Sequence, residues 1–120
     1  MPRTHVWFYA ERGISPPLLW IEAVPVGARD KLFYRVRRLE EAGHELRRPE
    51  SDFLRDGIHE LRCRHQRVNY RLLYFFHGRE AVIVHGCTKE GAVDRADIDR
   101  AVARRLQYEK DPARHRFVQQ

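Results

Sequence analysis

The hydrophobic and polar positions from residue 58 to residue 89 predict three adjacent strands. The strands carry arginines among apolar residues, and turn-forming segments at 64–67 and 77–80 separate them. The expected strands are 58–65, 69–76 and 81–89. Because side chains alternate along a strand, Arg62 and Arg64 are expected to point to the same face of the sheet.

Helical periodicity occurs on both sides of these strands. A short helix is expected after Ser15, which can cap it, and it ends at Pro25. A second helix is expected from about Gly27 to Ala42, where apolar residues recur at three- and four-residue steps. A third begins near Asp94, in an arrangement that resembles a helix cap, and stops at Asp111. The apolar stripe of this last helix is expected to be Ile98, Ala101, Val102 and Leu106.

The order of these elements indicates the fold class. A short first strand is expected at 6–9, and the segment 47–57 is interpreted as a polar connector. Strands and helices that come in runs indicate an α+β fold with a mostly antiparallel sheet. We expect the two N-terminal helices to cover one face and the arginines to use the other, open face. One domain is expected over residues 1–112, followed by a flexible tail at 113–120.

The net charge of the chain limits the classes of partner that it is expected to bind. The 120 residues carry a net charge of +6, with a pI of about 9.8. This basic excess favours nucleic acid, an acidic protein or an anionic membrane. No apolar run approaches the roughly 20 residues that span a bilayer, and the N-terminus lacks the pattern of a signal peptide. We therefore expect a cytoplasmic protein with no membrane partner and with reduced cysteines.

The arginines of the predicted sheet are the main functional candidates. The segment 58–79 contains five arginines and a single acidic residue, Glu60. Charges on an exposed sheet face often pair across strands, which contributes under about 1 kcal/mol per pair. One carboxylate cannot neutralise five guanidinium groups, so an external anion is the simpler interpretation. Arginine binds phosphate through two parallel hydrogen bonds. The candidate phosphate ligands are Arg62, Arg64 and Arg71, with Arg67 as a further candidate for RNA binding.

The second predicted helix carries a run of cations on its outer face. Such a run is usually a solvated surface. The alternative is a stripe that follows a nucleic-acid backbone, and Arg35 and Arg38 are its candidates.

Other residues offer acid–base or stacking chemistry. Lys89 could hold phosphate, or act as a base if neighbouring arginines favour loss of its proton. His85 and His65 titrate near neutrality, although His85 alternates with apolar residues and a structural role is its alternative. Tyr70 could stack on a base or pack in the core, and Glu60 could act as a base or pair with an arginine.

No metal site and no cofactor are expected. The chain has seven histidines and two cysteines, yet no Cys-x-x-Cys, no His-x₃-His and no other zinc spacing. It also lacks a glycine-rich phosphate loop and a Gly-x-Ser-x-Gly elbow.

The chain resembles the RelE/HigB superfamily, particularly its phage-derived HigB-like branch. The resemblance covers residues 4–110 and rests on element order, size, basic composition and the strings 61–64, 70–75 and 82–89. Members are toxins of type II toxin–antitoxin pairs that cleave mRNA without metal, usually in the ribosomal A site. The resemblance implies a RelE-like fold, attack by a ribose 2′-hydroxyl, mRNA and the ribosome as partners, and a helix-turn-helix antitoxin.

Family residues map onto this chain one by one. The family's basic-x-basic pair matches Arg62 and Arg64, and the arginine of its next strand matches Arg71. The string that ends the last strand in the HigB-like branch matches His85 to Lys89. The resemblance thus implies a catalytic site of Arg62, Arg64, Arg71, His85 and Lys89.

Two departures keep other interpretations open. Glu90 replaces the second lysine of the branch, and no tyrosine between 89 and 105 matches the C-terminal tyrosine of some members. The alternative is a non-catalytic module that binds RNA or an acidic protein through the same face. A third interpretation is a structural phage-derived protein.

Overall fold

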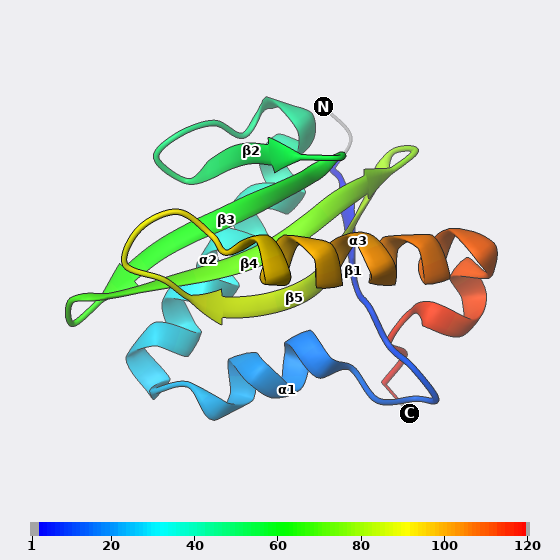
Figure 1. Cartoon of the computed structure of the whole chain (residues 1–120), viewed down its shortest axis with the longest axis horizontal. Helices are drawn as coiled ribbons and strands as arrows, with labels where there is room; N and C mark the ends of the chain where they lie inside the picture. The colour runs from blue at the N-terminus through cyan, green and yellow to red at the C-terminus, as the bar shows by residue number, and fades with distance from the viewer. Residues whose placement is uncertain (1–2, 120) are drawn as a thin grey trace.

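A mixed five-stranded sheet separates two helices from a third (Figure 1). The computed structural model describes residues 3–119, and Met1, Pro2 and Gln120 lie outside the described residues. The strands are β1 (His5–Phe8), β2 (Ser51–Arg55), β3 (Ile58–His65), β4 (Val68–His77) and β5 (Glu80–Thr88). The helices are α1 (Pro16–Ala23), α2 (Val26–Ala42) and α3 (Arg95–Lys110), with 3-10 turns at Gly43–Glu45 and Pro112–His115. Within residues 3–119, no helix has both the length and the apolar character needed to cross a membrane.

The sheet has the strand order β1-β5-β4-β3-β2. β1 runs parallel to β5, and the other neighbouring strands are antiparallel. The predicted α+β fold with a mostly antiparallel sheet is therefore confirmed, and it is compatible with a RelE-like fold. The three predicted central strands agree with β3, β4 and β5 to within one residue at each end.

β2 was not predicted, because its segment was interpreted as part of a polar connector. Ser51 pairs with Leu61 of β3, and a bulge interrupts the register between Phe53 and Arg55. β2 is an edge strand, so it needs no continuous apolar run. Its sequence therefore resembled a loop.

The turn between β3 and β4 places one candidate arginine at an exposed tip. Gln66 and Arg67 have positive φ angles of 48° and 70°. Two residues in this conformation suit the right-handed twist of a tight hairpin. Arg67 is consequently exposed at the end of the β3–β4 hairpin.

The two N-terminal helices pack on one face of the sheet, as predicted. Apolar residues of α1 and α2 meet alternate residues of the central strands in one core, which includes Ile21, Leu32, Leu39, Leu61, Leu72 and Ile83. Tyr70 belongs to this core and its ring lies 6.1 Å from that of Trp20. Tyr70 therefore lies on the face opposite to Arg71, and its burial favours core packing over the base stacking expected as one alternative.

α3 covers part of the other face, which was expected to be open (Figure 1). Its buried residues Ile98, Ala101 and Tyr108 form a second core with Leu73, Phe75, Val82 and Val84. Leu106 was predicted to face inward but is 56% exposed. The inner stripe passes through Arg105 instead, whose guanidinium lies 5.4 Å from the centre of the Phe75 ring. Beyond this cover, Arg62 is half-buried and Arg64 is exposed.

The expected flexible tail packs against the fold as far as Phe117. The amide of Phe117 donates to the carbonyl of Phe8 at 2.8 Å. The guanidinium of Arg116 donates to the Tyr108 hydroxyl at 2.9 Å and to Glu80 at 3.2 Å. These contacts depend on single residues far apart in the chain, so no periodic pattern in the sequence predicted that the tail would pack.

Candidate functional site

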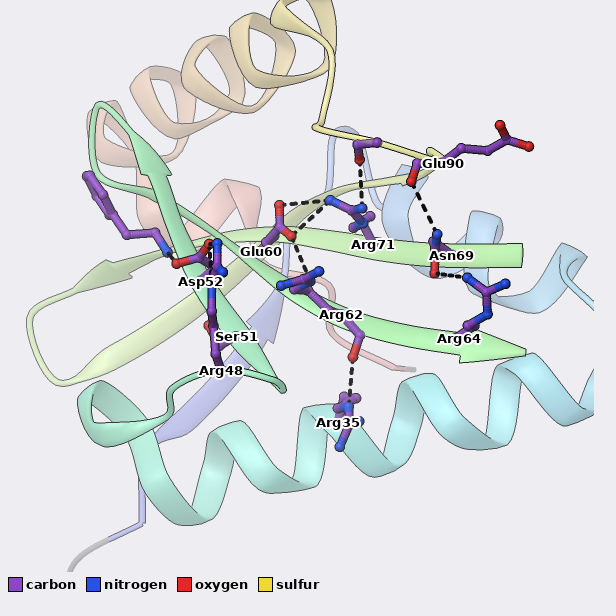
Figure 2. A network of polar contacts seen from close by, with 12 residues as sticks. Arg35, Arg48, Ser51, Asp52, Glu60, Arg62, Arg64, Asn69, Arg71 and Glu90 are labelled. Atoms are coloured by element: carbon purple, nitrogen blue, oxygen red, sulfur yellow. Dashed lines mark hydrogen bonds and ion pairs between the residues drawn. The ribbon is translucent and has the colours of Figure 1, made fainter. Parts of the chain in front are cut away.

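Three predicted site arginines share the face of the sheet on which α3 lies. Arg62 of β3 lies directly opposite Arg71 of β4, and Arg64 lies opposite Asn69. Figure 2 shows the guanidinium groups of Arg62 and Arg71 turned toward Glu60, while Arg64 extends beside Asn69. The alternation of β3 therefore places Arg62 and Arg64 on one side, as expected from their spacing.

Glu60 lies between the two central arginines. Its side chain is buried, with carboxylate oxygens 2.9 Å and 3.2 Å from Arg71 Nη1. The same carboxylate lies 3.2 Å from Arg62 Nε. Like charges directly opposite in a sheet repel each other, and Glu60 offsets this repulsion. The two guanidinium groups and one carboxylate leave a net positive charge.

Arg71 is bonded both to Glu60 and to the segment after β5. The residue is only 5% exposed, and its Nη2 donates to the carbonyl of Gly91 at 2.7 Å. It thus connects β4 to the segment between β5 and α3. This burial favours a positioning role for Arg71 over the direct phosphate contact predicted from the sequence.

Arg62 and Arg64 present their charge to solvent. The Arg62 side chain is 36% exposed, and among residues 3–119 its one ion pair is that with Glu60. Arg64 Nη1 donates to the neutral side-chain oxygen of Asn69 at 3.3 Å. Both guanidinium groups therefore retain donors for an external anion.

Two shallow clefts meet at Arg62. One has a volume of about 460 Å³, and its walls include Asp52, Glu60, Arg62 and Glu90. The other has a volume of about 220 Å³ and is lined by Arg35, Pro49, Arg62, Cys63, Arg64, Asn69 and Arg71. We call this second space the arginine cleft, because four arginines and no carboxylate line it.

Arg35 contributes to the arginine cleft from α2 while supporting β3. Its Nε donates to the carbonyl of Arg62 at 2.8 Å, and its Nη1 donates to Glu50 at 3.1 Å. One turn earlier, Lys31 Nζ donates to the carbonyl of Arg64 at 3.0 Å. β2 pairs with β3 only as far as Leu61, so these cations satisfy carbonyls that lie beyond the paired strand.

Arg38 and Arg67 lie outside both clefts. Arg38 donates to Glu50 at 2.9 Å and to Glu41 at 3.0 Å, and these hydrogen bonds raise the pKa of Arg38. Arg67 has no ion pair among residues 3–119. Of these two candidates, Arg67 is therefore the cation left available to an anion.

His85 and Lys89 pair with acidic residues next to or within α3. His85 Nε2 lies 2.7 Å from Asp97, and burial lowers the pKa of His85 although Asp97 opposes this shift. Lys89 pairs with Asp94, and their hydrogen bond raises the pKa of Lys89. Lys89 is thus a poorer base than an isolated lysine. Neither residue lines a cleft at Arg62, so the structure separates both from the arginines with which they were grouped.

One group among residues 3–119 has the ligand atoms for a metal ion. Donor atoms of His85, Cys87 and Asp97 lie within 4.8 Å of one another. Burial raises the pKa of the Cys87 thiol to about 12, so this sulfur is protonated at neutral pH. Arg104 Nη1 also lies 3.5 Å from His85 Nδ1. A protonated thiol and an adjacent guanidinium both disfavour a bound cation.

Sequence reasoning identified the cations more fully than their partners. Glu50 lies in the segment interpreted as a connector, although it pairs with Arg35 and Arg38. Asp94 was interpreted as a helix cap, but it makes no capping hydrogen bond with its side chain. Asp97 also lies in this segment, three residues after Asp94. Only the packing of α3 against β5 shows which cations they meet.

One family model matches most of the chain. A family model described as phage-derived protein Gp49-like (DUF891) matches residues 19–106. This range runs from α1 into α3 and contains all four arginines of the arginine cleft. No curated protein matches the chain. The Gp49-like proteins are a RelE/HigB-like toxin family of toxin–antitoxin systems. The match extends over more than half of the chain, which therefore belongs to the phage-derived Gp49-like family.

Proposed function

We propose that this chain is the mRNA-cleaving toxin of a type II toxin–antitoxin pair. The observation that carries the proposal is the arginine cleft, where Arg35, Arg62, Arg64 and Arg71 gather without a carboxylate in the walls. A chain phosphate fits such a site because guanidinium groups bind its oxygens through paired hydrogen bonds. Membership of a toxin family supports the same assignment.

Cleavage of RNA without a metal involves three tasks. The ribose 2′-oxygen loses its proton and bonds to phosphorus, while the bond from phosphorus to the 5′-oxygen breaks and that oxygen gains a proton. The products are a 2′,3′-cyclic phosphate, which water can open to a 3′-phosphate, and a 5′-hydroxyl. Arg62 and Arg64 would stabilise the extra negative charge on the phosphate. Glu60 is the carboxylate that pairs with Arg62, and it also contacts Arg71.

The open shape of the cleft favours a partner that completes the site. A shallow cleft of about 220 Å³ encloses little of an RNA strand, so we propose that the ribosome positions the mRNA. An antitoxin is implied by the family, and we propose that it is a small helix-turn-helix protein. Acting on ribosome-bound mRNA would place the toxin in the cytoplasm.

Induction of the chain in bacteria, with mapping of new mRNA ends, tests this proposal. We expect growth arrest and ends with a 5′-hydroxyl inside reading frames. Arg62→Ala should lower the cleavage rate by about 10²–10³, the usual effect of removing one preorganised donor. Arg37→Ala is the matched control, because Arg37 is exposed on α2 and lines neither cleft. Equal losses from both substitutions would contradict a defined site.

A non-catalytic RNA-binding module is the second candidate, and one observation favours it. His85 and Lys89 are paired away from Arg62, and no histidine or tyrosine lines the two clefts that meet there. This candidate predicts intact transcripts together with salt-sensitive RNA binding. Arg64→Ala should then reduce the slope of log affinity against log salt by about 1, since one phosphate contact is lost.

A further inference from the structure

A separate pocket lies at the β2 edge of the sheet, just beyond the end of α2. It has a volume of about 530 Å³, and its walls include His44, Arg47, Phe53, His59 and Phe76. We call it the aromatic pocket. None of these five residues contributes to the arginine cleft.

Flat rings dominate this pocket. The His44 and Phe76 rings are stacked with centres 3.6 Å apart, and His59 stacks on Tyr74 at 5.2 Å. Phe53 meets His59 edge-on at 5.1 Å and is 55% exposed. An aromatic side chain this exposed on an edge strand, beside an open space, is a candidate surface for a flat ligand.

A cation lies beside these rings. Arg47 is exposed, and its Nη1 donates to the carbonyls of His44 at 2.5 Å and Leu46 at 3.1 Å. Within residues 3–119 it has no carboxylate partner. The backbone therefore orients a guanidinium whose charge is not neutralised, which favours an anionic ligand.

The aromatic pocket adjoins the larger cleft at Arg62. Arg48 and Asp52 line both spaces, and they pair with each other at 2.6 Å. Figure 2 shows this pair on the β2 side of Glu60 and Arg62. An RNA strand that passes from Arg62 to the rings would run around the β2 edge beside Arg48, because Tyr74 and Phe76 face α2 and Arg62 lies on the face of α3.

We propose that the aromatic pocket binds one unpaired base of single-stranded RNA, stacked on Phe53, while Arg47 contacts a neighbouring phosphate. The proposal rests on the proposed function for the nature of the ligand. Stacking of splayed bases on aromatic rings, with cations along the backbone, is how proteins bind single strands. An apolar protein helix would match the cationic rim less well. The pocket would thus add a base contact to the phosphate contacts of Arg62 and Arg64.

Binding of short RNA oligonucleotides that carry 2-aminopurine tests this proposal, because stacking quenches that fluorescent base. The full chain should quench a single-stranded probe, and Phe53→Leu should weaken binding about tenfold or more and remove the quenching. Phe53→Trp should preserve binding, since the ring face is kept. Phe33→Leu is the matched control, because Phe33 is an exposed phenylalanine on α2 outside the pocket.

Each outcome bears on a different part of the proposal. Salt-sensitive RNA binding that Phe53→Leu leaves unchanged would overturn the base site and leave the proposed function standing. Absence of RNA binding by the unaltered chain, with intact transcripts in cells, would overturn both. Unchanged RNA binding with a weakened antitoxin complex would assign the pocket to a protein and overturn the base site. Because Phe53 is largely exposed, the variants should fold, which thermal unfolding can verify.

Discussion

Arg62 and Arg71 occupy directly opposite positions on neighbouring strands and contact the same carboxylate, yet their surroundings differ greatly. Both residues border the two clefts, but the Arg62 side chain is 36% exposed. The Arg71 side chain is 6% exposed and is fixed by Glu60 and by the carbonyl of Gly91. One guanidinium is available to a ligand, and the other is part of the framework.

Position within the sheet accounts for this difference. β4 is flanked by β3 and β5, and the segment after β5 passes over Arg71. On the edge of β3 away from β4, the pairing with β2 ends at Leu61, and side chains of α2 lie beyond it. This leaves Arg62 and Arg64 nearer the surface. Equal charge in the sequence therefore does not mean equal access to an anion.

The largest expected effect is a difference in the free energy of unfolding between alanine variants of these two arginines. Arg71→Ala leaves Glu60 buried with one partner fewer, and breaking a buried pair costs about 3–5 kcal/mol. Arg62→Ala removes a partly exposed contact and should cost under about 1 kcal/mol. Urea unfolding measures both free energies. A loss for Arg71→Ala no greater than that for Arg62→Ala would remove the distinction between framework and ligand site.

A second variant isolates the cause of that loss. In Glu60→Met with Arg71→Met, both buried charges are replaced by apolar side chains of similar length. This double variant should recover much of the stability lost in Arg71→Ala, because no unpaired charge remains buried. Failure to recover would indicate that Arg71 matters through its hydrogen bond to Gly91 and not through its charge.

The strands that form the centre of the sheet could be predicted from the sequence, because β3, β4 and β5 have strong apolar and aromatic patterns. β2 could not, since an edge strand such as Ser51–Arg55 has little apolar character. The position of α3 was also missed in part. Its inner stripe includes Arg105, whose guanidinium lies over the Phe75 ring, and a hydrophobic pattern does not include such a residue.

The shared face of Arg62 and Arg64 follows from strand alternation and needed no structure, whereas Arg71 joins them through the register of β3 with β4. Which of them remains free depends on residues distant in sequence. Glu50 and Gly91 meet the arginines only through packing of α2 and of the segment after β5. A net count of charges between 58 and 79 could not reveal these partners.

A smaller effect concerns the pH dependence of the free energy of unfolding. His85 contacts Asp97 of α3, and burial lowers the pKa of His85. Asp97 opposes this shift, while Arg104 and Arg100 add to it. The unfolded chain, with a histidine pKa near 6.5, then binds a proton more readily than the folded chain. This contribution to stability is present above about pH 6.5 and is lost as the pH falls through the lower, folded-state pKa.

Unfolding experiments at a series of pH values measure that loss. His85→Gln should flatten the decrease in stability on acidification, because the titrating group is removed while a side chain that can contact Asp97 remains. Arg62→Ala should leave the slope unchanged, since guanidinium groups do not titrate in this range. A slope that His85→Gln does not alter would place the responsible group elsewhere, for example at His59, whose pKa burial also lowers.

The smallest expected effect concerns Lys89, a cation that is accessible but paired. Its ion pair with Asp94 lies near the surface, where such pairs contribute about 0.2–1 kcal/mol and are screened by salt. Lys89→Ala should therefore lower the free energy of unfolding by less than about 1 kcal/mol, with a smaller loss at 1 M salt. Because Lys89 lines neither cleft at Arg62, its removal should also slow mRNA cleavage far less than Arg62→Ala does. Comparable losses of cleavage from Lys89→Ala and Arg62→Ala would mean that RNA displaces Asp94 from Lys89. An ion pair in the free chain would then not show that a cation is unavailable to RNA.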